Sequence, residues 1–207
     1  MTIFRCERVD RPDGALRADW ERRLSYEIVK SGDGRRKVVQ RDWKPWLEHI
    51  GSLYNRYVAE EYPSPFALHE QATVGLLVSA AALGGYLSYN EYELSKKGRD
   101  DKRRRVEGRA DYWMECGGRA YSFEVKRAYF GSTRAKLRKV MNAAIADARC
   151  ICDDECDQAV ALMIAHMNGD TEPEVYETFA SERDVHQVYR VGPRGEGGTF
   201  LFLSLVG

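Results

Sequence analysis

The sequence has no excess of charge of either sign, because 32 lysine and arginine residues balance 32 aspartate and glutamate residues. Any attraction for a polyanion therefore has to come from local patches. Long apolar runs are also missing. The longest, near residues 72–83, is too short to span a bilayer. With no signal peptide at its start, the chain is expected to be cytoplasmic and to engage no membrane.

Cysteine is scarce and odd in number. Five cysteines in a chain without an export signal indicate reduced thiols rather than a disulfide framework. Cys150, Cys152 and Cys156 cluster, but their spacing fits no zinc or iron–sulfur pattern, so we expect thiols at a helix end. The four histidines are scattered, which argues against a zinc site. The sequence also lacks a phosphate-binding glycine loop and a nucleophile elbow.

A hairpin pattern is present in residues 108–129. Apolar and polar residues alternate over 111–116 and again over 121–126, which is the period of a strand. Gly117 and Gly118 separate the two runs and are typical of a two-residue hairpin loop, because both positions adopt positive φ without steric cost. The resulting register sets Asp111 opposite Glu124.

Two facing carboxylates predict a cation site. Their Cβ atoms would lie about 4.5–5.5 Å apart on one face, where like charges destabilise a sheet. Mg²⁺ would offset this repulsion, since it prefers oxygen ligands and is usually held by one or two carboxylates. Strand alternation turns Lys126 to the same face as Glu124. The plainer interpretation is a solvated face with a surface ion pair worth at most about 1 kcal/mol.

The combination of Asp111 with Glu124-Val125-Lys126 on the next strand resembles the motif of the PD-(D/E)xK nuclease superfamily, with Ala110 in place of the proline. The resemblance covers roughly residues 64 to 167. It implies a restriction-endonuclease-like core of helix, three antiparallel strands, helix and strand. It further implies that Asp111, Glu124 and the carbonyl of Val125 bind Mg²⁺, for which Mn²⁺ can substitute, and that Lys126 orients the attacking water.

Periodicity in the flanking residues predicts the same order of elements. A helix over 64–83 should begin at Ser64 and lie buried on nearly every side, and a strand is expected over 86–94. A second helix capped by Ser132 precedes a buried strand over 159–165, parallel to the Glu124 strand. A helix over 173–181 and strands over 185–191 and 199–206 follow. The expected fold class is α/β (α+β), with a mixed sheet flanked by helices and C-terminal strands extending it.

Two domains are expected, an N-terminal extension over residues 1–62 and a nuclease-like domain over 63–207. In the extension, residues 24–29 and 37–40 would pair as a hairpin. Asp42 would then cap a helix that carries Trp46, Leu47, Ile50, Tyr54 and Tyr57 on one side.

Glu70 is an acid within the apolar first helix. The resemblance implies that this helix supplies an acid to the metal site, which makes Glu70 a further catalytic and metal-binding candidate. The alternative is that Glu70 only complements the dipole at the helix start. The sequence leaves both readings open.

Two basic segments predict a nucleic-acid surface. Residues 96–109, expected as a loop before Asp111, contain eight basic residues against three acids, and the helix after Ser132 begins with cations that oppose its dipole. Such residues contact the phosphate backbone without reading sequence. The candidates are Lys96, Lys97, Arg99, Lys102, Arg103, Arg104, Arg105, Arg134, Lys136, Arg138 and Lys139.

The leading hypothesis is a Mg²⁺-dependent nuclease that hydrolyses phosphodiester bonds of DNA, with RNA not excluded. It could act as a homodimer or within a larger nuclease or defence complex. The main alternative is an inactive module of the same fold that binds nucleic acid or regulates another protein. A third is an interaction protein with an acid-lined sheet face.

Overall fold

The computed structural model describes residues 26–98, 100, 101, 103–129, 131–167, 173–192 and 198–206. The strands are β1 (Tyr26–Lys30), β2 (Leu87–Lys97), β3 (Arg105–Cys116), β4 (Arg119–Ala128), β5 (Gln158–His166), β6 (Gln187–Val191) and β7 (Thr199–Val206). The helices are α2 (Arg35–Asp42), α3 (Lys44–Ala59), α4 (Glu70–Leu83), α5 (Arg134–Ala148) and α6 (Pro173–Ala180).

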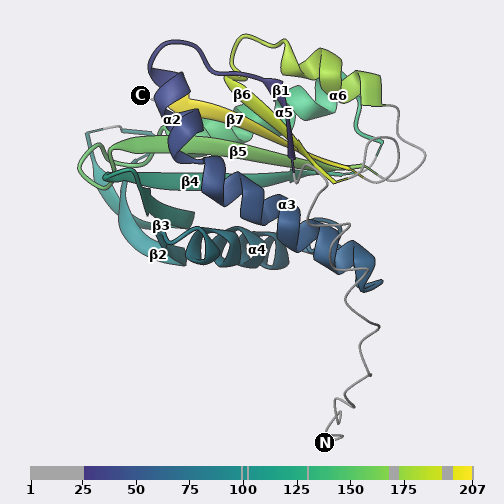
Figure 1. The fold of residues 1–207 in the computed structure, drawn as a ribbon. Coiled ribbons are helices and arrows are strands. Elements are labelled where there is room, and N and C mark those ends of the chain that lie inside the picture. The colour runs from purple at the N-terminus through teal and green to yellow at the C-terminus, as the bar shows by residue number, and fades with distance from the viewer. Residues whose placement is uncertain are drawn as a thin grey trace, which may run out of the picture.

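These elements form an α/β fold around one seven-stranded mixed sheet with the order β1-β6-β7-β5-β4-β3-β2 (Figure 1). Helices α3 and α4 bury apolar residues against one face of the sheet, and α5 and α6 bury theirs against the other. No helix in the described part of the chain is long and apolar enough to cross a membrane.

The central hairpin forms at the predicted glycines. Gly117 and Gly118 have φ angles of 59° and 72°, and Cys116 pairs with Arg119 across the turn. Strands β2, β3 and β4 are antiparallel, and β5 returns parallel to β4 after α5. The predicted order of helix, three antiparallel strands, helix and parallel strand is therefore confirmed for these elements.

The predicted pairing of residues 24–29 with 37–40 is wrong, because residues 35–42 form helix α2. Strand β1 pairs instead with β6, at the edge of the main sheet, which satisfies its backbone without a hairpin partner. Trp43 rather than Asp42 occupies the N-cap position of the next helix, α3, and its side chain makes no capping hydrogen bond. Of the predicted face, α3 buries Trp46, Leu47, Ile50 and Tyr54, whereas Tyr57 is exposed. Residues 26–59 therefore share the sheet and core with the later elements.

The helix predicted from Ser64 begins only at Glu70. Ser64 Oγ accepts a hydrogen bond from the N–H of Phe66 in a separate turn, and His69 Nδ1 caps α4 by accepting from Ala72 N–H. Helix α4 is also less buried than expected, since Leu83 is 58% exposed. Similarly, Thr133 rather than Ser132 caps α5, by accepting from the N–H of Lys136.

The basic segment 96–109 is not a long loop. Strand β2 continues to Lys97 and β3 starts at Arg105, and these two residues pair across the sheet. The hairpin bends toward the end of α5, where the N–H of Lys97 donates to the carbonyl of Cys150 and that of Cys152 to Ser95. Basic residues of this segment therefore lie beside α5, on the face that carries the candidate site.

Candidate functional site

The position of Asp111 follows from the end of the ladder between β3 and β4. The paired register runs from Cys116 and Arg119 to Tyr112 and Phe123, one step short of Asp111 and Glu124. At that step Asp111 Oδ2 accepts a hydrogen bond of 2.7 Å from the backbone N–H of Val125. The predicted register is correct over this hairpin, and the aspartate side chain continues it by bonding to β4.

Glu124 is buried beside Asp111, with 3% of its surface exposed. Lys96 Nζ on β2 donates a hydrogen bond of 2.6 Å to Glu124 Oε1. Burial, with the neighbouring charge of Asp111, raises the pKa of Glu124 above its ordinary value, and the contact with Lys96 only partly opposes this. Gly108 leaves room for the Lys96 side chain, because a Cβ there would lie 2.8 Å from Lys96 Cδ. Lys96, which the sequence predicted to contact nucleic acid, therefore forms an ion pair with Glu124.

Lys126 lies in a ring of carboxylates. Its Nζ is 3.9 Å from Asp111 Oδ2 and 3.4 Å from Asp147 Oδ2 on α5. Burial would lower the pKa of Lys126, but Asp111, Asp147, Glu124 and Glu70 outweigh it and raise the pKa above the ordinary value. Lys126 is therefore a firmly protonated cation.

Sequence reasoning missed Asp147. A signal for it exists: Asp147 follows Ala144 by three positions, so this acid adjoins the apolar stripe that buries α5 against the sheet. Which strand residue it would meet depends on how α5 packs, and that cannot be read from the helix alone.

Glu70 is an exposed residue at the first position of α4. Partial desolvation and then the charge of Asp111 raise its pKa, whereas Lys126 and Arg127 oppose the rise. Glu70 therefore lies within the electrostatic reach of Asp111 and Lys126. Its position at the helix start also suits the helix dipole, so both interpretations of this residue fit.

Glu91 is a second acid that the sequence did not single out. It occupies the register position opposite Asp111, between the pairs Asn90–Tyr112 and Tyr92–Ala110. Its φ angle is 46°, which is unusual for a residue other than glycine within a strand. Such a conformation persists only where surrounding contacts enforce it.

Within the described residues, no group of three or more His, Cys, Asp and Glu side chains gathers closely enough to hold a metal ion. Asp111 and Glu124 nevertheless form a pair of oxygen donors close enough for one charge to shift the pKa of the other. One or two carboxylates are what Mg²⁺ usually takes from a protein, so the donor chemistry fits this ion. A cavity of about 160 Å³ is lined by Lys96, which pairs with Glu124, by Asp147, which pairs with Lys126, and by residues 97, 106 and 150.

Many of the predicted nucleic-acid-binding cations already have acidic partners. Lys97 contacts Asp153 at 2.7 Å and Arg105 contacts Asp154 at 2.8 Å. Arg134 and Arg138 each lie 2.6 Å from Glu182. The remaining described candidates are exposed: Arg103, Arg104, Lys136 and Lys139. Arg99 and Lys102 lie outside the described residues.

The four cysteines in the described part of the chain are free thiols. Cys150 lies two residues after the end of α5, and Cys152 and Cys156 lie in the connection to β5, while Cys116 ends β3. Burial raises the pKa of the Cys116 thiol to about 12, so it is un-ionised and unreactive at neutral pH.

Comparison with protein-family models, with curated proteins and with solved structures finds no significant match for this chain.

Proposed function

We propose that the protein is a Mg²⁺-dependent nuclease that hydrolyses phosphodiester bonds of DNA. The observation that carries this proposal is the convergence of Asp111, Glu124 and Lys126 on one face of two adjacent strands. Lys126 lies 3.9 Å from Asp111, and the charge of Asp111 acts on Glu124. A lysine ammonium beside the two acids can offset the negative charge that develops on a phosphate during hydrolysis.

The order of the elements supports a restriction-endonuclease-like core. Helix α4, strands β2 to β4, helix α5 and strand β5 follow one another, with β5 parallel to β4. This is the sequence of elements that the resemblance to the PD-(D/E)xK superfamily implies. The motif residues lie on β3 and β4, the strands that the family uses for them.

Asp111, Glu124 and the carbonyl of Val125 would hold the Mg²⁺ ion, with Glu70 contributing from the start of α4. Mn²⁺ would be accepted in the same place, since it also takes oxygen ligands. When bound, the ion would lower the pKa of the attacking water and stabilise negative charge on the scissile phosphate.

Lys126 would act as a donor and not as a base. Its raised pKa keeps the ammonium protonated at neutral pH, so it cannot remove a proton from water. It can donate hydrogen bonds to the attacking water and to a phosphate oxygen. Asp147, 3.4 Å from Nζ, would hold the ammonium in position.

The backbone of DNA would lie along the β2–β3 hairpin and the first turns of α5. Phosphates there would compete with Asp153 and Asp154 for Lys97 and Arg105. Replacing the exposed Asp153 and Asp154 by phosphates as partners of these cations costs little, because a surface ion pair contributes at most about 1 kcal/mol. Such contacts give affinity that falls with salt and carries no sequence preference.

A cleavage assay tests the proposal directly. Linear, branched and single-stranded DNA are incubated with purified protein in Mg²⁺, Mn²⁺ or chelator. We expect cleavage with either metal, none with chelator, and none from Glu124→Ala or Lys126→Ala, while Asp153→Asn stays active. Circular dichroism checks that each variant is folded. Full cleavage by the Glu124→Ala, Lys126→Ala double variant would sink the proposal.

One contact favours a second candidate, an inactive nucleic-acid-binding or regulatory module. Lys96 sits 2.6 Å from Glu124, where it already supplies the positive charge that a metal would bring. Such a module would retain DNA in a way that depends on salt and ignores metal. Titration of Mg²⁺ with and without a DNA duplex separates the two, since only the nuclease predicts linked binding of metal and DNA.

A further inference from the structure

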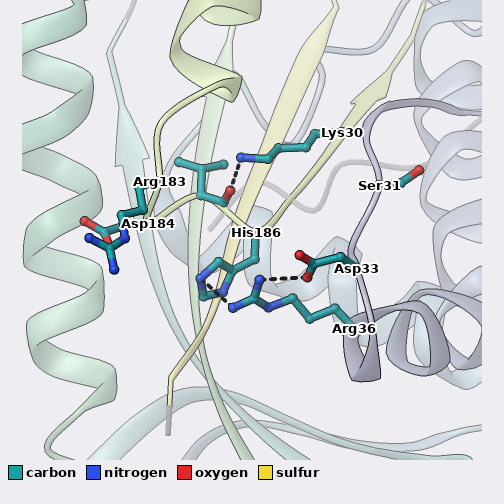
Figure 2. Close-up of a pocket in the computed structure, with 8 residues that line it drawn as sticks. Lys30, Ser31, Asp33, Arg36, Arg183, Asp184 and His186 are labelled. Carbon is teal, nitrogen blue, oxygen red and sulfur yellow. Dashed lines mark hydrogen bonds and ion pairs between the residues drawn. The ribbon is translucent and has the colours of Figure 1, made fainter.

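A second group of charged side chains lines a cavity of about 510 Å³ where β1 leads into α2 (Figure 2). Lys30, Asp33 and Arg36 come from one segment, and Arg183, Asp184 and His186 come from the connection between α6 and β6. The pairing of β1 with β6 brings the two segments together. Strands β6, β7 and β5 separate β1 from β4, so this cavity is distinct from the candidate nuclease site.

The ring of His186 faces hydrogen-bond donors at both nitrogens. The backbone N–H of Leu205 donates to Nδ1 at 3.0 Å, and the guanidinium nitrogen Nη2 of Arg36 lies 3.1 Å from Nε2 (Figure 2). A neutral imidazole carries one hydrogen, so acceptance at Nδ1 leaves that hydrogen on Nε2. Arginine has no acceptor, and two donors then point at each other. An oxyanion placed beside both groups would accept from each of them.

The charges around the cavity also lack full compensation. Burial lowers the pKa of His186 and of Lys30, and Arg36 lowers both further through its positive charge. Asp33 contacts Arg36 at 2.9 Å, but its side chain is 86% exposed and therefore well screened by water. Asp184 is exposed as well. A bound anion would relieve the repulsion among the cations.

The cavity is held in shape by buried groups behind it. Gln187, which is fully buried, donates from Nε2 to the carbonyl of Arg36 at 2.7 Å and accepts from the hydroxyl of Tyr189 at 2.9 Å. Gly32 lies so close that a Cβ there would be 2.5 Å from Arg36 Cβ. Lys30 Nζ donates to the carbonyls of Glu182 and Val185, which leaves a third N–H. These contacts orient the donors before any ligand arrives.

We propose that this cavity binds a sugar phosphate, with the phosphate at Arg36, His186, Lys30 and Arg183 and the hydroxyls at Asp33 and Asp184. Donors that approach from two segments suit the three terminal oxygens of a phosphate monoester better than a planar carboxylate. The volume falls within the range of about 300–1,000 Å³ that is usual for small-molecule sites. Val185 is the single apolar residue in the lining, so an apolar ligand is disfavoured.

Isothermal titration calorimetry of the full chain with ribose 5-phosphate, inorganic phosphate and ribose tests this site. We expect saturable binding of ribose 5-phosphate at one site, binding of phosphate about tenfold weaker, and no binding of ribose. Each charged hydrogen bond contributes enough that Arg36→Gln or His186→Gln should weaken ribose 5-phosphate by about tenfold or more. If either variant unfolds, Arg183→Gln replaces it in the test, because this substitution changes an exposed residue and leaves the buried network intact.

Lys126→Ala is the matched control, because Lys126 is a partly buried cation of the candidate nuclease site, where a phosphate would also find a positive charge. Its affinity for ribose 5-phosphate should equal that of the wild type. If Lys126→Ala loses binding and Arg36→Gln keeps it, the anion binds at the candidate nuclease site and the assignment is overturned. Absence of saturable binding by the wild type, or affinity unchanged in all three pocket variants, would overturn it too.

Discussion

The carboxylate of Asp111 accepts a hydrogen bond of 2.7 Å from the backbone N–H of Val125, the residue that follows Glu124. This bond lies one step beyond the last backbone pair of the β3–β4 ladder. Because a side chain on one strand bonds to the main chain of the other, the spacing between the two acids is held by β4 itself. This hydrogen bond thereby helps to fix the positions of the proposed metal ligands.

Asp111→Asn should separate the structural role of this residue from its chemical role. The amide oxygen can still accept from Val125, so the free energy of unfolding should stay within about 0.5 kcal/mol of the wild type. Asp111→Ala leaves the N–H without its acceptor and should cost about 1–3 kcal/mol. Both variants should lose Mg²⁺-dependent cleavage. Urea denaturation followed by circular dichroism measures the first effect, and equal destabilisation by the two variants would contradict it.

Lys96→Met should destabilise the protein by about 2 kcal/mol at neutral pH, because it leaves the buried charge of Glu124 without its ion pair. The loss should shrink as the pH falls, because Glu124, whose pKa is raised by burial, takes up a proton more readily than an ordinary glutamate. Mg²⁺ should then stabilise this variant more than the wild type, since it replaces the missing positive charge. Thermal melting with and without Mg²⁺ measures this difference.

Lys97→Met is the control for Lys96→Met. Lys97 pairs with the exposed Asp153, so its loss should change stability by no more than about 0.5 kcal/mol. An identical response of both variants to Mg²⁺ would show that Glu124 does not bind the ion.

Asp147→Asn should lower kcat about tenfold and leave KM nearly unchanged, because Asp147 positions Lys126 and does not contact the substrate. Removing its charge lowers the pKa of Lys126, so the alkaline limb of the pH–rate profile should move to lower pH. Asp154→Asn, on the surface beside Arg105, is the matched control. An unchanged pH profile would assign Asp147 a merely structural role.

Gly118→Ala should cost about 1 kcal/mol, because φ is 72° and the added Cβ meets open space. Gly117→Ala should cost more, since its Cβ would also lie 2.7 Å from Asp42 Oδ2. Adding Asp42→Ala to the Gly117→Ala variant should remove the excess. Equilibrium unfolding in urea reports all three values, and equal costs at both glycines would argue against the contact with Asp42.

Acid should destabilise the protein partly through His166. Burial and the charge of Arg127 lower the pKa of this imidazole to about 4, whereas an unfolded chain has its ordinary value near 6.5. The unfolded state therefore binds the proton first, and stability is lost as pH falls from about 6.5 to 4. His166→Asn should lose less stability over this range. Urea midpoints at pH 7 and pH 5 test the difference, and parallel curves would contradict it.

Local patterns were sufficient for most of the elements. The glycine pair in a strand pattern sets both the turn and the register, because side chains alternate along each strand. The apolar stripe of α5 and the continuous apolar run of β5 likewise follow from spacing alone. The residues that usually mark the start of a helix predicted the boundaries less reliably. Ser64 caps a short turn, and residues 37–40 adopt a helix because β1 finds its partner in β6.

Some contacts of the candidate site also follow from local patterns, and others do not. Asp111, Glu124 and Lys126 lie on neighbouring strands, and their approach was determined by the sequence itself through the turn and the strand period. The contacts of Lys96 with Glu124 and of Asp147 with Lys126 join residues 28 and 21 positions apart through the bend of a hairpin and the packing of a helix. Only the tertiary structure decides such contacts, because no local period relates their partners. The same holds for the cavity at His186, which exists because β1 and β6 meet from opposite ends of the chain.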